Sequence, residues 1–151
     1  MDHNYYMELA LEEARCAYAK GEVPVGAVLV INNRVVAKAH NTREESQQVL
    51  NHAEILVIKK ACEKIGLWRL NNSYLYTTVE PCVMCSGAIV QARIENVIFG
   101  AKDSKYGCCG SRMNIVNSDK FNHKANVVAG VLEDKCSQLI TGFFKELREK
   151  K

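Results

Sequence analysis

Residues 73–85 read SYLYTTVEPCVMC, and this stretch decides the fold class. Residues 73–79 are mostly aromatic or β-branched, which predicts a strand. Because a proline is tolerated in the first turn of a helix, Pro81 predicts a helix that opens directly after this strand and runs to about Arg93. A strand that leads straight into a helix is typical of α/β proteins.

The rest of the chain continues this alternation of strands and helices. Apolar spacing predicts helices over residues 5–20, 52–64 and 133–149, and β-rich runs predict strands over 25–31, 34–40, 96–100 and 126–129. Asn32-Asn33 predicts a tight hairpin turn between the first two strands. The order predicts a mostly parallel sheet that starts with an antiparallel hairpin and carries helices on both faces.

Length and composition favour one soluble domain spanning residues 1–151. The hydrophobic fraction of 48% is enough for a core, and no run of about 18 apolar residues predicts a membrane span. The N-terminus lacks the pattern of a signal peptide, so we expect the seven cysteines to be free thiols or metal ligands in the cytoplasm. The net charge of +3 permits nucleic-acid binding without requiring it.

Two short motifs carry the candidate chemistry. His52-Ala53-Glu54 offers one imidazole, and Cys82 and Cys85 offer two thiols at the head of the helix that Pro81 predicts. Three protein ligands leave the fourth tetrahedral position of a zinc ion open for water, which is typical of catalytic zinc. Glu54 is not needed as a ligand, and a carboxylate beside an activated water can move its protons.

Each motif alone is weak, because a single C-x-x-C is often structural or redox-active and a single H-x-E means little. H-x-E followed by P-C-x-x-C is the signature of zinc nucleobase deaminases, so together they are far more specific. The alternative is a structural zinc, which needs a fourth protein ligand. The candidates for that ligand are Cys108, Cys109 and His123.

Other residues allow two interpretations. Asn41 ends a predicted strand, and its carboxamide suits a purine edge or an Asx turn equally. Phe143-Phe144 is mostly core, although one ring could stack on a base. Three further cysteines fall on apolar helix faces, and we expect them in the core: Cys16, Cys62 and Cys136.

From about Tyr5 to Arg148 the chain resembles the bacterial tRNA-specific adenosine deaminases of the cytidine-deaminase-like superfamily. The zinc motif fits the whole superfamily, whereas EVPVGAV at residues 22–28 and EPCVMC at residues 80–85 are much more specific to the adenosine branch that acts on tRNA. Further matching positions are Phe99-Gly100-Ala101, Asn122-His123 and Phe143-Phe144. One departure is Gln48-Val49-Leu50-Asn51, where many relatives have Asp-Pro-Thr-Ala.

The resemblance implies a three-layer α/β/α sandwich with a central five-stranded mixed sheet, and a homodimer. It implies hydrolysis of adenosine to inosine at the wobble position of a tRNA anticodon, with one Zn²⁺ per chain bound by His52, Cys82 and Cys85. Glu54 would be the catalytic acid and base. The substrate-binding residues implied by position are Asn41 at the purine, Val28 and Ala53 around the base, and Asp103, Asn122, His123 and Phe143 on the anticodon loop.

In the expected mechanism a zinc-activated water attacks C6 of an adenine that has left the base stack, and Glu54 passes protons to the ring and to the departing ammonia. A rival with the same chemistry is a deaminase of free bases or nucleosides, of the guanine or cytidine type. A second rival is a non-catalytic RNA-binding subunit with a structural zinc. Glu54 argues against that rival, since a structural site has no use for the carboxylate.

Overall fold

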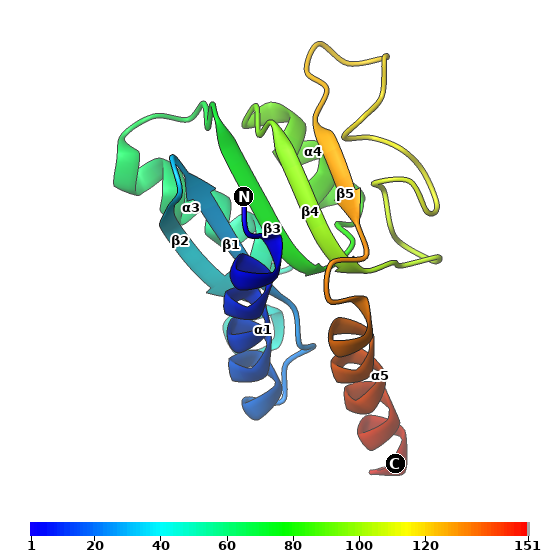
Figure 1. Ribbon diagram of the computed structural model, residues 1–151. Helices are drawn as coiled ribbons and strands as arrows, with labels where there is room; N and C mark the ends of the chain where they lie inside the picture. Colours follow the sequence, from blue (N-terminus) through cyan, green and yellow to red (C-terminus); the bar gives the residue numbers. More distant parts are fainter. Residues whose placement is uncertain (151) are drawn as a thin grey trace.

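Five strands form one mixed sheet with the order β2-β1-β3-β4-β5 in this computed structural model, which describes residues 1–150 (Figure 1). The strands are β1 (Gly26–Ile31), β2 (Arg34–His40), β3 (Ser73–Val79), β4 (Asn96–Ala101) and β5 (Asn126–Ala129). The helices are α1 (His3–Ala19), α2 (Arg43–Ser46), α3 (Ala53–Ile65), α4 (Val83–Gln91) and α5 (Glu133–Glu149). The predicted fold class and the predicted five-stranded mixed sheet are confirmed.

The sheet combines an antiparallel half with a parallel half. β1 pairs antiparallel with both β2 and β3, while β3, β4 and β5 run parallel. The hairpin turn falls at Asn32 and Asn33, whose φ angles of 52° and 60° are those of a tight left-handed turn. Because β3 and β4 are parallel, the segments that follow them leave the same edge of the sheet.

Helices cover both faces of the sheet, with α1 and α5 on one face and α3 and α4 on the other (Figure 1). Side chains alternate between faces along each strand, so β1 sends Val28 toward α1 and Leu29 toward α3. Two buried apolar clusters result. The α1 side contains Met7, Leu11 and Tyr76, and the α3 side contains Val57, Leu75 and Phe99.

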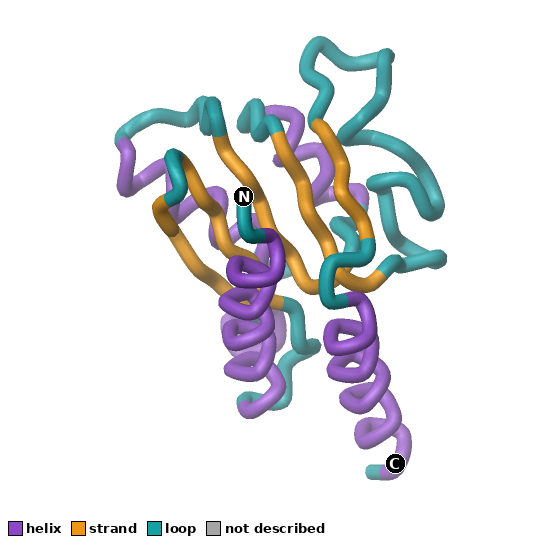
Figure 2. Tube along the Cα trace, in the orientation of Figure 1, coloured by secondary structure: helices purple, strands orange, loops and turns teal. Residues whose placement is uncertain are grey.

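The structure differs from the sequence-based expectation at several places. The helix expected to open at Pro81 begins at Val83, and the short helix α2 follows β2, where the sequence predicted no helix. Cys16 is exposed and Cys62 is half-buried rather than in the core, although Cys136 is buried as expected. Figure 2 shows residues 102–125, which connect β4 to β5, as a long loop. No helix within residues 1–150 is long and apolar enough to cross a membrane.

Gly26 brings α1 into direct contact with β1. A Cβ atom added at Gly26 would lie 2.0 Å from the backbone oxygen of Ala10 and 2.6 Å from the backbone nitrogen of Ala14. Both are atoms of the helix backbone, so no side-chain rotation could relieve the clash. The glycine therefore sets the distance between the helix and the sheet.

We expect Gly26→Ala to lower the free energy of unfolding by about 2–3 kcal/mol, because overpacking a tight core contact forces the backbone to shift. Gly142→Ala in α5 is the matched control, since an added Cβ there meets nothing within 4 Å. That variant should gain about 0.5–1 kcal/mol from the better helix propensity of alanine. Urea unfolding measures both, and a wild-type midpoint for Gly26→Ala would contradict the close contact.

Candidate metal centre

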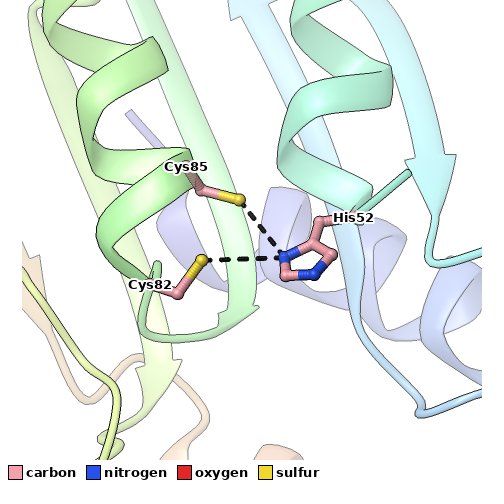
Figure 3. Close-up of side chains that lie close together, drawn as sticks. All are labelled: His52, Cys82 and Cys85. Atoms are coloured by element: carbon pink, nitrogen blue, oxygen red, sulfur yellow. Dashed lines mark hydrogen bonds between the residues drawn. The ribbon is translucent and has the colours of Figure 1, made fainter. Parts of the chain in front are cut away.

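Two helices begin at the same place, and the residue at each N-cap turns toward the other. His52 is the N-cap of α3 and Cys82 is the N-cap of α4, both with extended backbone. Serine, threonine, aspartate or asparagine usually occupies this position and bonds to the helix N–H groups. Neither side chain makes such a cap bond here. Figure 3 shows instead that His52, Cys82 and Cys85 point toward one another.

The three side chains form a compact donor group. Nδ1 of His52 lies 3.6 Å from Sγ of Cys82 and 3.5 Å from Sγ of Cys85 (Figure 3). All three donor atoms lie within 4.8 Å of one another, and this is the only such group that could hold a metal ion within residues 1–150. In tetrahedral zinc sites, Zn–S bonds of about 2.3 Å and Zn–N bonds of about 2.0–2.1 Å give an S···N edge of about 3.6 Å. The donor set and its spacing therefore fit a zinc ion.

The electrostatic environment favours a thiolate at this centre. Hydrogen bonding with Cys85, and then with His52, lowers the pKa of the Cys82 thiol to about 4. The same hydrogen bond raises the pKa of Cys85, and the bond with Cys82 raises the pKa of the His52 imidazole. The unpaired N–H groups and the dipole at the start of α4 also stabilise a negative sulfur.

Glu54 provides a carboxyl group directly beside the donor group. It lies in the first turn of α3 and is only 4% exposed. Burial is the main reason that the pKa of Glu54 rises to about 7, and its side chain interacts with that of Cys85. A carboxyl group with this pKa can take up or release a proton near neutral pH, which is the property a general acid and base needs.

Asn41 forms the Asx turn, which is one of the two roles that the sequence allowed for it. Its Oδ1 accepts a hydrogen bond of 3.1 Å from the backbone N–H of Arg43, which forms an Asx turn, and its Nδ2 donates to the carbonyl of Val23 at 3.2 Å. The side chain is buried at 7% exposure. One Nδ2 hydrogen and one Oδ1 lone pair remain, so the turn leaves the carboxamide able to contact a base.

Two residues expected at the substrate lie elsewhere. Val28 is fully buried against α1, on the face of the sheet opposite α3 and α4, so it cannot line a pocket at the metal centre. Strand alternation decides this, because neighbouring strand residues face opposite sides. Phe143 is 8% exposed and packs edge-to-face on Tyr18, whereas Phe144 is 40% exposed. Phe143 is therefore a core residue whose ring is not available for stacking.

The remaining predicted residues are spread over the β4–β5 loop and α3. Asp103 follows β4 and holds a turn, since its Oδ1 accepts from the N–H groups of Lys105 and Tyr106. Asn122 is exposed. His123 lies at the carbonyl of Ile94, beyond the C-terminal end of α4 and thus away from Cys82. Ala53, which lies between His52 and Glu54 in the sequence, is fully buried. Of the candidate fourth ligands, none of Cys108, Cys109 and His123 joins the donor group.

Sequence reasoning missed two buried carboxylates, Glu22 and Glu80, which are 2% and 3% exposed. Both stand within the motifs that carry the resemblance, but neither received a role. Burial alone would raise the pKa of Glu80, yet hydrogen bonds from Ser111, Asp103 and Cys109 hold it below its usual range. The available signal was a charged residue placed inside a strongly apolar segment, because unpaired charges are almost never fully buried.

Comparison with known proteins agrees with this geometry. The family model of the MafB19-like deaminases matches residues 1–148. The chain therefore belongs to this deaminase family. A tRNA-specific adenosine deaminase of Bacillus subtilis (strain 168) is 54% identical over 146 residues, which cover 97% of this chain and 91% of the relative. The resemblance drawn from the motifs is confirmed.

Solved structures resemble the chain to different degrees. A structure from a study of A-to-I editing by tRNA:A34 deaminases at the wobble position has a TM-score of 0.86 and 43% identity, and the match covers 89% of this chain and 98% of that one. A guanine deaminase from Bacillus subtilis has a TM-score of 0.64 and 36% identity over 68% of this chain and 66% of its own. The tRNA deaminase thus matches more of the chain and matches it more closely.

We expect Cys82→Ser and Cys85→Ser to lose bound metal, because loss of even an outer-shell partner weakens metal sites by about 10–100-fold and loss of a ligand should do more. Inductively coupled plasma mass spectrometry of the purified proteins gives the zinc content per chain. Cys16→Ser is the matched control, since this thiol is exposed and lies outside the donor group. Full zinc content in both ligand variants would rule out this centre.

Proposed function

We propose that the chain is a zinc-dependent tRNA adenosine deaminase, which converts adenosine to inosine at the wobble position of an anticodon. The observation that carries this proposal is the three-donor centre with the buried Glu54 carboxyl group beside it. The names of the similar proteins, an adenosine deaminase specific for tRNA and a tRNA:A34 deaminase, support the substrate. The homodimer remains a prediction from the resemblance, and the cytoplasmic location remains a prediction from the N-terminal sequence and the cysteines.

His52, Cys82 and Cys85 would hold one zinc ion. Two thiolates and a neutral imidazole balance the charge of Zn²⁺, and three protein ligands leave one position open. When bound, zinc supplies Lewis acidity that lowers the pKa of water from 15.7 to about 7. Besides zinc, the reaction needs protein groups that move protons and groups that hold the base.

Glu54 would carry the protons of the reaction. Hydrolytic deamination takes both protons from water, places one on the purine ring and delivers the other to the departing amine, which leaves as ammonia. A carboxyl group whose pKa burial has raised to about 7 can change its protonation state at each of these steps with little cost. Its position in the first turn of α3 holds it two residues from His52, beside the donor group.

The surroundings of the centre suit a single-stranded RNA loop. Four exposed cations stand on the two segments that flank the centre: Arg43, Lys102, Lys105 and Arg112. Phosphate groups bind such side chains, and a base in a loop leaves its stack at lower cost than one in a duplex. Asn41 and Ala53 are the proposed contacts to the base, and Asp103 and Asn122 are proposed contacts to the loop.

A second candidate is deamination of a free base, which the similarity to a guanine deaminase favours. The two reactions separate in one assay. Purified protein is incubated with an anticodon stem-loop that carries adenosine at the wobble position, and in parallel with free adenosine, cytidine and guanine. We expect inosine in the stem-loop and no turnover of the free compounds. Turnover of guanine with an unedited stem-loop would reassign the substrate.

We expect Glu54→Gln to retain its zinc and to lose more than about 100-fold in kcat, since general acid–base catalysis contributes about 10²–10⁴-fold. Single-turnover conversion of the stem-loop and metal analysis of the same sample provide the two measurements. Glu63→Gln is the matched control, because Glu63 is an exposed carboxylate on the same helix. Normal turnover by Glu54→Gln would refute the assigned role.

A further inference from the structure

The carboxylate of Glu80 is an acceptor for the beginning of the β4–β5 loop. Oε1 accepts from the backbone N–H of Asp103 at 3.1 Å and from the hydroxyl of Ser111, and Oε2 accepts from the N–H groups of Cys109 and Ser111 at 3.0 Å each. Gly107 packs on the same group, since an added Cβ would lie 2.4 Å from Cδ of Glu80. Each oxygen thus has two donors, all from one short segment.

No cation compensates this charge within the part of the chain that the structure describes, where every ion pair involves other acidic residues. The Glu80 carboxylate is instead neutralised by N–H and O–H dipoles, as in backbone anion nests. Charge-assisted hydrogen bonds of this kind are about twice as strong as neutral ones. The arrangement therefore orders the segment that donates them, residues 103–111, which we term the Glu80-bound segment.

Glu22 repeats the same design on the other flank of the metal centre. It is buried, and its two oxygens accept from the N–H groups of Glu44 and Glu45 at 3.0 and 2.6 Å. These residues belong to α2, in the segment that leads into His52. The backbone of Thr42 also bonds to that of Asn51 at 3.1 Å, next to His52.

The Glu80-bound segment lies against the start of α4. The N–H of Cys108 donates to the carbonyl of Pro81 at 2.9 Å, one residue before Cys82. Within or beside this segment, the exposed side chains are those of a nucleic-acid surface: Lys102, Lys105, Tyr106 and Arg112. Glu80 fixes the backbone of this segment, and therefore the position of these side chains relative to the metal centre.

We propose that Glu80 is a positioning residue that fixes residues 103–111 beside the metal centre, so that Lys105 within this segment, and Lys102 and Arg112 directly before and after it, meet the phosphates of the substrate RNA. This inference rests on the proposed function for the identity of the substrate. It does not depend on that function for the ordering of the segment. The hydrogen bonds of the Glu80 carboxylate all go to the loop and none to the donor group, so Glu80 acts through the loop that it holds.

Glu80→Gln tests the proposal with almost no change in shape. With its NH₂ group at the Oε2 position, the amide faces two backbone N–H donors; at the Oε1 position it faces the N–H of Asp103 and the Ser111 hydroxyl, which can accept instead. At least one of the four hydrogen bonds is therefore lost, and the others lose the negative charge that strengthens them. Amide hydrogen exchange of the native protein should then become about tenfold or more faster at Asp103, Cys109 and Ser111, because buried donors left unpaired are costly. The zinc content should remain one per chain.

The salt dependence of anticodon stem-loop binding is a second measurement. It would not change in Glu80→Gln if Glu80 only stabilised the fold. The affinity is measured in the Glu54→Gln background over a series of salt concentrations. We expect about tenfold weaker binding at low salt, with a log–log salt slope that is shallower by about 0.7 for each phosphate that the protein no longer neutralises. A uniform loss of affinity with an unchanged slope would overturn the proposed effect on phosphate binding.

Three further variants keep the test decisive. Gly107→Ala pushes the segment off the carboxylate from the other side, so it should reproduce the exchange and salt effects even where Glu80→Gln folds poorly. Glu22→Gln should speed exchange at Glu44 and Glu45 and leave Cys109 protected. Glu12→Gln, an exposed carboxylate on α1, should change neither region.

The possible outcomes are distinct. Faster exchange confined to residues 103–111, retained zinc and a shallower salt slope support the proposal. Unchanged exchange in Glu80→Gln, or loss of its zinc, overturns the positioning role. If unsubstituted protein does not bind the stem-loop, the proposed function fails and the substrate half of this inference fails with it. The exchange measurement still decides whether Glu80 orders the segment.

Discussion

Everything at the candidate site depends on two helix N-termini that meet beyond one edge of the sheet, where β2 and β3, which both run antiparallel to β1, end. His52 and Cys82 occupy the N-caps of α3 and α4, where a capping side chain would normally satisfy the helix N–H groups. The protein gives up that local stabilisation, and the two side chains face each other as metal donors. Because the positive ends of both helix dipoles point at this spot, the site favours thiolate sulfur and bound anions.

The order of strands and helices could be predicted because the periodicity of this sequence is strong. The expected strand over residues 73–79 and the hairpin at Asn32-Asn33 appear as β3 and the β1–β2 turn. The start of α4 could not be predicted to the residue. Pro81 is compatible with the first helical turn, but the carbonyl of Pro81 bonds to Cys108 in the distant loop, and the helix begins at Val83. A tertiary contact thus overrides the local preference.

In the candidate site, too, some residues could be predicted from the sequence and others could not. The donor group could be predicted because zinc chemistry restricts both the residue types and their spacing, and a three-donor group has few alternatives. Val28 and Phe143 were misplaced for a different reason. Resemblance assigns a role to a position in a motif, but strand alternation and helix packing decide which face a side chain occupies. Val28 faces α1 and Phe143 faces Tyr18, so both contribute to the core on the opposite side of the sheet.

Glu22 and Glu80 show why the loops around this centre need anchors of an unusual kind. The loop between β4 and β5 covers residues 102–125, and its one backbone bridge joins Cys109 to Asn114. The other hydrogen bonds inside the loop, such as those from the N–H of Gly107 to Asp103 and from the N–H of Ile115 to Cys108, join parts of the loop to one another and leave it free to move relative to the sheet. A buried carboxylate that accepts four bonds from it removes this freedom, and the carboxylate is itself fixed by the end of β3, where the N–H of Glu80 donates to Ala101 at 2.8 Å. Glu80, which holds the loop, and Cys82, which belongs to the metal donors, thus both lie between the end of β3 and the start of α4. The rigid sheet therefore orders the metal donors and the loop beside them through this one short segment.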